Sequence, residues 1–405
     1  MSKVFYGWKM VAAGAGMQFL HSALMYQSFG AYFALLMEEF GWSKTAIAVA
    51  AALQPMEAAI LGPFLGWVLD RFGPQRMIRL GVVIMSLGFA VFATVDSLAT
   101  FYFAFFVIAL GSSLCGFFPM NVAVIHWFER KRARALSMMA LGLALGGVAV
   151  PLVAVVMQGY GWRVAALASA VVILVVGWPI ARVIRGRPER YGEYVDGEPP
   201  TIAPAGVPQE APRREFSAGE ALRTRAFWMI SLGHGFALLV VSAVNVHAVS
   251  HLTQSLDLSL VQASGVVTLM TVAQVGGVLL SSAIGDRFDK RHLSALCMLM
   301  HSSGLLMLAY ATGPAMLLAF ALLHGCGWGL RGPLMQAIRA DFFGKRAIGM
   351  ILGISSLIMV IGQVGGPMLA AVVADLTGHY RIGFTILACA AGLGAGFFLF
   401  ARRPA

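Results

Sequence analysis

Long apolar runs, separated by short polar segments, follow one another from the beginning of the chain to its end. A helix needs roughly 20 predominantly apolar residues to cross the hydrocarbon core of a bilayer. Applied to these runs, that length predicts twelve spans, near residues 8–36, 45–69, 77–95, 99–127, 135–158, 163–184, 226–254, 259–284, 293–311, 315–338, 348–375 and 382–401. The pattern therefore predicts an all-α integral membrane protein.

One long hydrophilic segment, residues 186–222, separates the first six runs from the last six. It contains six prolines and charges of both signs, a composition that does not bury an apolar core. We therefore expect an N-terminal six-helix bundle at 1–185, a linker at 186–222 and a C-terminal six-helix bundle at 223–405.

The distribution of lysine and arginine predicts the orientation, because cytoplasmic loops carry an excess of both. With the N-terminus inside, 25 of the 29 cations fall in the inner segments and only Lys44, Arg163 and Arg381 in the outer ones. Both termini and the linker are thus predicted to be cytoplasmic. No targeting segment precedes the first run, so we expect a prokaryotic inner membrane.

Composition excludes several classes of protein. The chain is 59% hydrophobic and 12% charged, about half the charge of a typical soluble domain. The net charge of +11 is divided among short clusters between the runs, which argues against a nucleic-acid surface. The four cysteines lie inside apolar runs without ligand spacing, so neither a disulfide frame nor a metal site is expected. No nucleotide-binding loop is present, and we expect no cofactor.

The two halves repeat each other. Gly66–Gly73, between spans two and three, matches Ser282–Asp289, between spans eight and nine, 216 residues later. Gly111–Pro119 in span four matches Gly325–Pro333 in span ten at an offset of 214. Parallel repeats of this kind predict a substrate site at their interface near the middle of the membrane.

The segment from Gly66 to Arg76 carries the most specific motif of the chain. Its Gly66, Asp70, Arg71, Gly73 and Arg76 resemble the Gly-x-x-x-Asp-Arg-x-Gly-x-x-Arg signature of the major facilitator superfamily. The resemblance covers the whole chain and implies rocker-switch alternating access. It also implies a cytoplasmic gate formed by Asp70, Arg71 and Arg76, and by Asp286 and Arg287 in the second copy. The excess of lysine and arginine in cytoplasmic loops would by itself explain the arginines of this motif, but it would not explain Asp70.

Three further segments resemble the monocarboxylate and oxalate/formate-type carriers of that superfamily: Tyr6–Lys9, Phe40–Ser43 and Trp127–Ala135. The resemblance implies a small organic anion as substrate.

Two positions depart from this branch. Where lactate carriers place an arginine in span eight, this chain has Thr268, Thr271 and Gln274. Where oxalate/formate exchangers place a lysine in span eleven, it has Ser355, Ser356 and Gln363.

Glu57 lies in the middle of span two, about 20 Å from either end at 1.5 Å per residue. Its side chain is too short to reach water from there. Burial disfavours the charged form of a carboxyl group, as a proton-coupling site requires. We expect Glu57 to take the proton; the alternative is a neutral structural glutamate.

Arg331 lies inside span ten, about 12 Å from its predicted inner end. His324, Trp328 and Arg331 are spaced i, i+4 and i+7 and so share one helix face. A guanidinium on that face could hold a carboxylate through two hydrogen bonds. The alternatives are that Arg331 reaches the inner interface or pairs with Glu57.

Other polar residues inside the spans are expected to contact the substrate. They are Gln18, His21, Asn121, Thr271, Gln274 and Gln363. Together these residues predict a secondary transporter of a small, monocarboxylate-like organic anion, coupled to protons. Alternatives are efflux of an amphiphilic or drug-like solute and a non-transporting ligand sensor on the same fold. An enzyme is not expected, because no nucleophile or metal set is visible; nor does the sequence indicate an obligatory protein partner.

Overall fold

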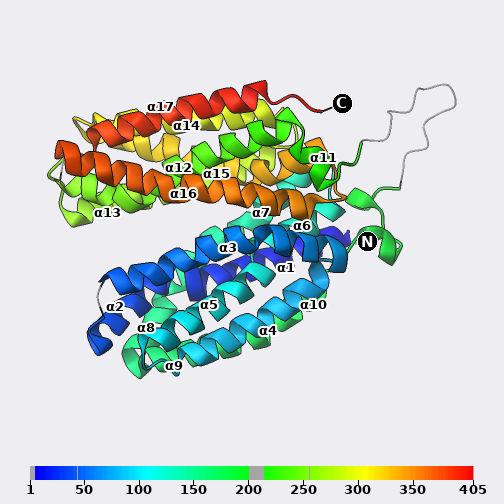
Figure 1. The fold of residues 1–405 in the computed structure, drawn as a ribbon, viewed down its shortest axis with the longest axis horizontal. Helices are drawn as coiled ribbons and strands as arrows, with labels where there is room; N and C mark the ends of the chain where they lie inside the picture. The colour runs from blue at the N-terminus through cyan, green and yellow to red at the C-terminus, as the bar shows by residue number, and fades with distance from the viewer. Residues whose placement is uncertain (1–4, 43, 200–213, 255, 405) are drawn as a thin grey trace. The chain divides into compact units, whose positions relative to one another are not determined.

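The computed structural model describes residues 5–42, 44–199, 214–254 and 256–404, and over these residues it consists of helices, turns and loops with no strand (Figure 1). The prediction of an all-α protein is confirmed.

Each predicted span coincides with one helix or with a run of consecutive helices. In the first half the helices are α1 (Tyr6–His21), α2 (Phe29–Phe40), α3 (Lys44–Phe72), α4 (Pro74–Phe92), α5 (Leu98–Cys115), α6 (Phe117–Trp127), α7 (Arg132–Leu145), α8 (Val150–Tyr160), α9 (Trp162–Val172) and α10 (Trp178–Val183). In the second half they are α11 (Ala218–Leu222), α12 (Arg225–Gln254), α13 (Leu260–Ile284), α14 (Lys290–Ala309), α15 (Pro314–Phe343), α16 (Ile348–Thr377) and α17 (Arg381–Phe400).

Among the residues that the structure describes, nine helices or helix runs are long and apolar enough to cross a membrane. The segment from α1 to α2, together with α3 and α15, occupies the other three predicted positions. The number of twelve spans stays a prediction.

Several predicted spans are interrupted rather than continuous. A π-helical turn, Ser22–Tyr26, separates α1 from α2, and another, Ile173–Gly177, separates α9 from α10. The first is held in place by Ser22, whose hydroxyl donates to the Leu143 carbonyl at 2.7 Å. Such turns are frequent at functional sites, and this one begins directly after His21.

The chain forms two compact units. Unit 1 comprises Met1–Arg213 and Ala347–Gly353, and unit 2 comprises Arg214–Arg346 and Ile354–Ala405. The first turns of α16 thus cluster with unit 1 and the rest of that helix with unit 2. The predicted bundle boundaries at 185 and 222 stay predictions.

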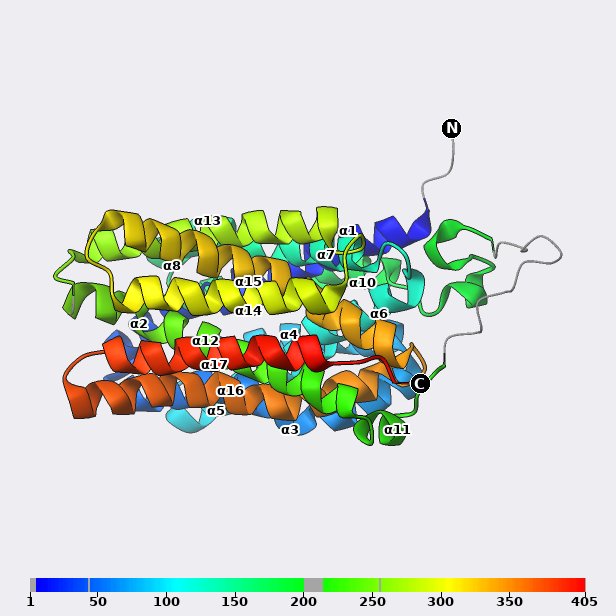
Figure 2. The same cartoon turned by 90° about the horizontal axis from the view of Figure 1, so that it is seen from above.

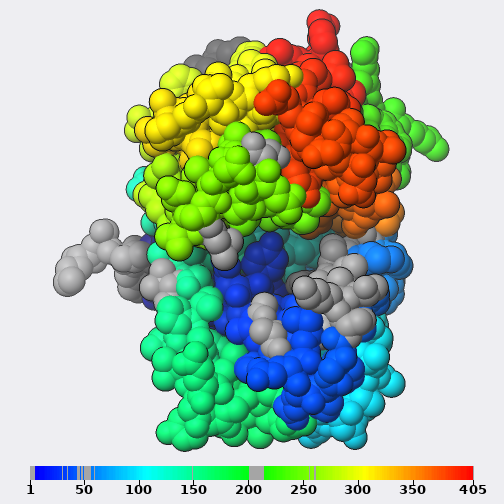
Figure 3. Space-filling model, turned by 90° about the vertical axis from the view of Figure 1, so that its left-hand side faces the viewer, coloured from blue at the N-terminus to red at the C-terminus, as the bar shows by residue number. Residues whose placement is uncertain are grey.

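Within unit 2, α14 lies between α15 and α17 (Figure 2). The end of this bundle shown in Figure 3 carries the turns that join α12 to α13, α14 to α15 and α16 to α17. Of the lysines and arginines in unit 2, only Arg381 lies at these turns. So few cations are what the sequence predicts for the extracytoplasmic side. The orientation itself stays a prediction.

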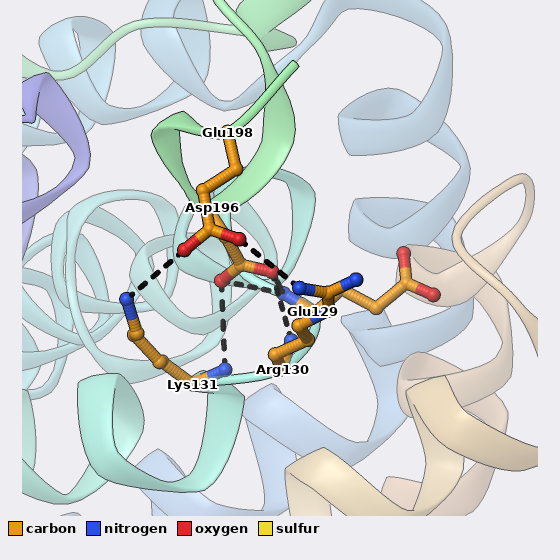
Figure 4. A network of polar contacts seen from close by, with 5 residues as sticks. All are labelled: Glu129, Arg130, Lys131, Asp196 and Glu198. Atoms are coloured by element: carbon orange, nitrogen blue, oxygen red, sulfur yellow. Dashed lines mark hydrogen bonds and ion pairs between the residues drawn. The ribbon is translucent and has the colours of Figure 1, made fainter. Parts of the chain in front are cut away.

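The first part of the segment predicted as a linker is folded around Asp196. Asp196 is buried, with a φ of 59°, in the left-handed region that non-glycine residues rarely adopt. Its carboxylate accepts from the backbone N–H groups of Glu129 (3.2 Å), Arg130 (2.9 Å) and Lys131 (3.5 Å), just before α7 (Figure 4). Glu198 pairs with the side chains of Arg130 and Lys131. This part of the predicted linker therefore belongs to unit 1 and packs on the turn before α7.

Replacing Asp196 with alanine should release this turn, because three backbone N–H groups lose a charged acceptor. Hydrogen bonds to charged groups contribute about 1.5–3 kcal/mol. We expect amide hydrogen exchange at residues 129–131 to rise about 30-fold, measured by mass spectrometry. The control is Glu198→Ala, which removes only exposed ion pairs worth roughly 1 kcal/mol or less. An equal effect of the two variants would contradict the role given to Asp196.

Candidate functional site

Unit 2 buries an arginine for which the described residues provide no counter-charge. Arg331 is 1% exposed, and its Nε and Nη1 atoms have no hydrogen-bond partner among the described residues. Arg331 also forms no ion pair with any residue that the structure describes. A buried, unpaired charge costs several kcal/mol, so a site that retains one favours an incoming anion.

The sequence of the surrounding helices explains why Arg331 is uncompensated. Helices α12, α13, α14 and α17 contain no aspartate or glutamate. Helix α15 contains only Asp341, near its end, and this residue pairs with Lys290 at 2.9 Å. Helix α16 contains only Asp375, which is exposed. The described interior of this bundle therefore offers a cation without a carboxylate to neutralise it.

His324 and Arg331 are both fully buried on α15, whereas Trp328, which lies between them in sequence, is half-buried. The Nδ1 atom of His324 lies 3.2 Å from Nδ1 of His301 on α14. Sequence reasoning did not identify His301, because its neighbourhood reads as an ordinary apolar run. Only the antiparallel packing of α14 on α15 brings the two imidazoles together.

A second buried arginine, Arg339, was wrongly assigned to the inner loop by the charge count. Helix α15 continues to Phe343, five residues past the predicted end, and this places Arg339 inside the bundle at 1% exposure. Its guanidinium donates to the Met335 carbonyl at 2.8 Å and lies 3.3 Å from both Ser355 Oγ and His234 Nδ1. Unlike Arg331, it has partners on three helices.

In unit 1, Glu57 is buried on α3 and accepts a hydrogen bond from the Ser113 hydroxyl of α5 at 2.9 Å. Its other oxygen, Oε1, has no partner among the described residues. The neighbouring Ser112 lies 3.1 Å from Nδ1 of His21 on α1. Two consecutive serines of α5 thus link the two titratable side chains of this site.

The remaining polar candidates fall into two groups. Gln18 and Asn121 are buried in unit 1, and the amide group of Gln18 and the Asn121 Nδ2 atom have no partner among the residues described. In unit 2, Thr271 and Gln363 are exposed and Gln274 is half-buried. The Thr271 hydroxyl donates to the Val267 carbonyl of its own helix. The buried groups of unit 1 are therefore the better placed for a ligand that supplies hydrogen bonds.

The predicted gate residue Asp70 lies near the end of α3, against the start of α16. Its two carboxylate oxygens accept from the backbone N–H groups of Gly349 at 2.9 Å and Met350 at 2.8 Å. The first N–H groups of a helix have no partner within the helix and carry partial positive charge, so a carboxylate is favoured there.

The other gate candidates have different surroundings. Arg71 lies over the Trp67 ring at 5.4 Å, and Arg76 is exposed in the first turn of α4. In the second copy of the motif, Asp286 is half-buried and Arg287 exposed. Asp70 is thus a residue that binds backbone groups of α16, and the cytoplasmic gate itself stays a prediction.

Replacing Asp70 with alanine should loosen the start of α16. Loss of a carboxylate cap costs about 1–2 kcal/mol, so amide exchange over residues 347–353 should rise about tenfold, measured by mass spectrometry.

The matched control is Asp289→Ala. Asp289 caps α14 through the Arg291 N–H at 2.8 Å, and the hydrogen bond from the Arg291 side chain holds the pKa of Asp289 below its ordinary value. This variant should affect the start of α14 only. If Asp70→Ala leaves residues 347–353 as protected as in the wild type, Asp70 does not hold this helix start.

The family model for the Major Facilitator Superfamily matches residues 15–248 and 230–405. Among curated proteins, the chain is 22% identical to monocarboxylate transporter 13 of Bos taurus, over 97% of this chain and 89% of that protein. It is 25% identical to the glycerol-3-phosphate transporter of Bacillus subtilis, over 82% and 78% respectively. Among solved structures, the E. coli fucose:proton symporter FucP matches with a TM-score of 0.69 and 15% identity, over 97% and 98% of the two chains. The chain belongs to the Major Facilitator Superfamily and is a secondary transporter rather than an enzyme.

Proposed function

We propose that this transporter carries a small organic anion together with protons, by alternating access. The observation that carries the proposal is Arg331, a fully buried guanidinium with two unpaired nitrogen atoms among the described residues, in a bundle interior without carboxylates. A carboxylate fits the planar guanidinium through two parallel hydrogen bonds and neutralises its charge.

We assign the remaining roles to the other residues that the sequence singled out. Arg331 anchors the anion, and His324 and Trp328 shape the space around it. Glu57 takes the proton, because it is a buried carboxyl group with one oxygen that has no partner among the described residues. Gln18, His21 and Asn121, with Thr271, Gln274 and Gln363, supply polar contacts to the substrate. Asp70 holds the start of α16 in the closed state of the predicted cytoplasmic gate.

The names of two relatives agree with an anionic substrate. One is called a monocarboxylate transporter and the other a glycerol-3-phosphate transporter. A carboxylate and a phosphate ester differ in shape, but each can be held by an arginine. The shared feature is the negative charge, which is what Arg331 would select.

The test is uptake of labelled lactate, pyruvate and oxalate into proteoliposomes that contain the purified protein, with and without an inward proton gradient. Uptake that rises with the gradient supports the proposal. A folded protein that takes up none of the three anions contradicts it, and export of an amphiphilic solute would then be tested in vesicles of the opposite orientation.

A further inference from the structure

Unit 2 contains two buried histidines in direct contact, and the proposed transport mechanism gives this pair no role. His301 of α14 and His324 of α15 are fully buried, with their Nδ1 atoms 3.2 Å apart and their ring centroids 4.6 Å apart. Two glycines lie where these helices meet: a Cβ on Gly304 would lie 3.3 Å from the backbone nitrogen of His324, and one on Gly327 would lie 3.2 Å from the Cys297 carbonyl oxygen. Both distances are shorter than ordinary Cβ contacts, so glycine eases the close approach of α14 and α15. Neither Nε2 atom has a partner among the described residues.

The contact between the two Nδ1 atoms restricts the protonation states of the pair. One Nδ1 carries the hydrogen and donates it, and the other accepts it through its lone pair. In the neutral pair, the accepting ring therefore carries its hydrogen on Nε2, while the donating ring has a bare Nε2. One further proton can add to that lone pair without breaking the contact, which gives a pair of charge +1.

The surroundings determine when this extra charge is tolerated. Among the described residues, the helices packed around the pair contribute no carboxylate near it. Their titratable or charged side chains include Arg331, Arg339 and Cys326 on α15, Cys297 on α14, His234 and His251 on α12, and Cys389 on α17. Arg331 is a buried cation on the same helix as His324, seven residues and thus about 10 Å further along it. Like charges in a medium of low dielectric repel strongly, and an anion bound to Arg331 would remove that repulsion.

We propose that His301 and His324 bind one proton for each anion held by Arg331, in addition to the proton taken by Glu57. The inference rests on the proposed function and adds its stoichiometry: two protons accompany one anion. The proton adds to the bare Nε2 as the anion arrives and leaves from it when the anion departs, with no other bond made or broken. Because linkage is reciprocal, the proton strengthens anion binding as much as the anion strengthens proton binding.

Membrane potential distinguishes two protons from one. Lactate and pyruvate carry one negative charge, so transport with two protons moves one net positive charge and transport with one proton moves none. At 100 mV, inside negative, one net charge corresponds to about 50-fold greater accumulation at equilibrium. We expect the wild type to show this dependence in proteoliposomes clamped with potassium and valinomycin at a fixed pH gradient.

His301→Asn keeps a polar group near the position of Nδ1 but cannot hold the additional proton. It should still accumulate lactate when driven by the pH gradient, with the dependence on membrane potential lost. The control is His251→Asn, which removes another buried histidine of unit 2, one bound to the Leu308 carbonyl; it should keep the potential dependence.

Each outcome bears on a different claim. Uptake by the wild type that follows the pH gradient but ignores the potential overturns the histidine proposal and leaves the proposed function standing, even if His301→Asn does not fold. Potential dependence that survives in His301→Asn also overturns it. Failure of the wild type to take up any of the anions overturns both.

Discussion

Replacing Arg331 with methionine should abolish anion uptake and leave the protein at least as stable as the wild type. Methionine fills a similar volume without a charge. An anion entering the site would lose its counter-charge, at a cost of about 3–5 kcal/mol, so uptake at low substrate concentration should fall at least 100-fold. The folded protein without substrate, in contrast, no longer buries an unpaired cation. Initial uptake rates in proteoliposomes and thermal unfolding in detergent measure the two effects.

Arg339 provides the matched control on the same helix. Both arginines are 1% exposed, but Arg339 is within hydrogen-bond distance of Met335, Ser355 and His234. Arg339→Met therefore leaves buried groups without a hydrogen-bond partner, at a cost of about 1–3 kcal/mol for each group. This variant should lower the unfolding temperature.

Arg331→Lys tests the geometry of the site. Lysine keeps the charge but not the planar fork, so part of the uptake should remain. If Arg331→Met instead unfolds at a clearly lower temperature than the wild type, Arg331 has a structural role and the anion site lies elsewhere.

The contrast between the two arginines shows what could be predicted from the sequence. The positions of the helices could be predicted because the length of an apolar run is fixed by the thickness of the bilayer. The end of α15 could not, since Arg339 and Asp341 look like loop residues in sequence and are accommodated by partners on other helices. A cation near a predicted span end is ambiguous until its partners are known.

Pairs of residues were harder to predict than single ones. Glu57 and Arg331 were identified because a charge inside a span is costly wherever it points. His301 was missed because a single histidine in an apolar run does not indicate a site; its contact with His324 does. That contact depends on the register of α14 against α15, which cannot be predicted from the sequence of either helix alone. Asp196 was missed for the same reason: its capping of the turn before α7 requires a backbone conformation that the composition of the linker does not indicate.

Replacing Glu57 with glutamine should remove one coupled proton while the anion site remains intact. Glutamine resembles the protonated carboxyl group and can still bond to the Ser113 hydroxyl, so the transport cycle continues without that proton. Each coupled proton contributes about tenfold accumulation per pH unit of gradient; at a gradient of one unit, accumulation of lactate should therefore fall about tenfold. Exchange of labelled for unlabelled lactate without a gradient should stay near the wild-type rate. Glu38→Gln, which changes an exposed carboxylate of α2, is the control and should change neither quantity. If gradient-driven accumulation is unchanged in Glu57→Gln, the proton is carried elsewhere and Glu57 is a neutral structural residue.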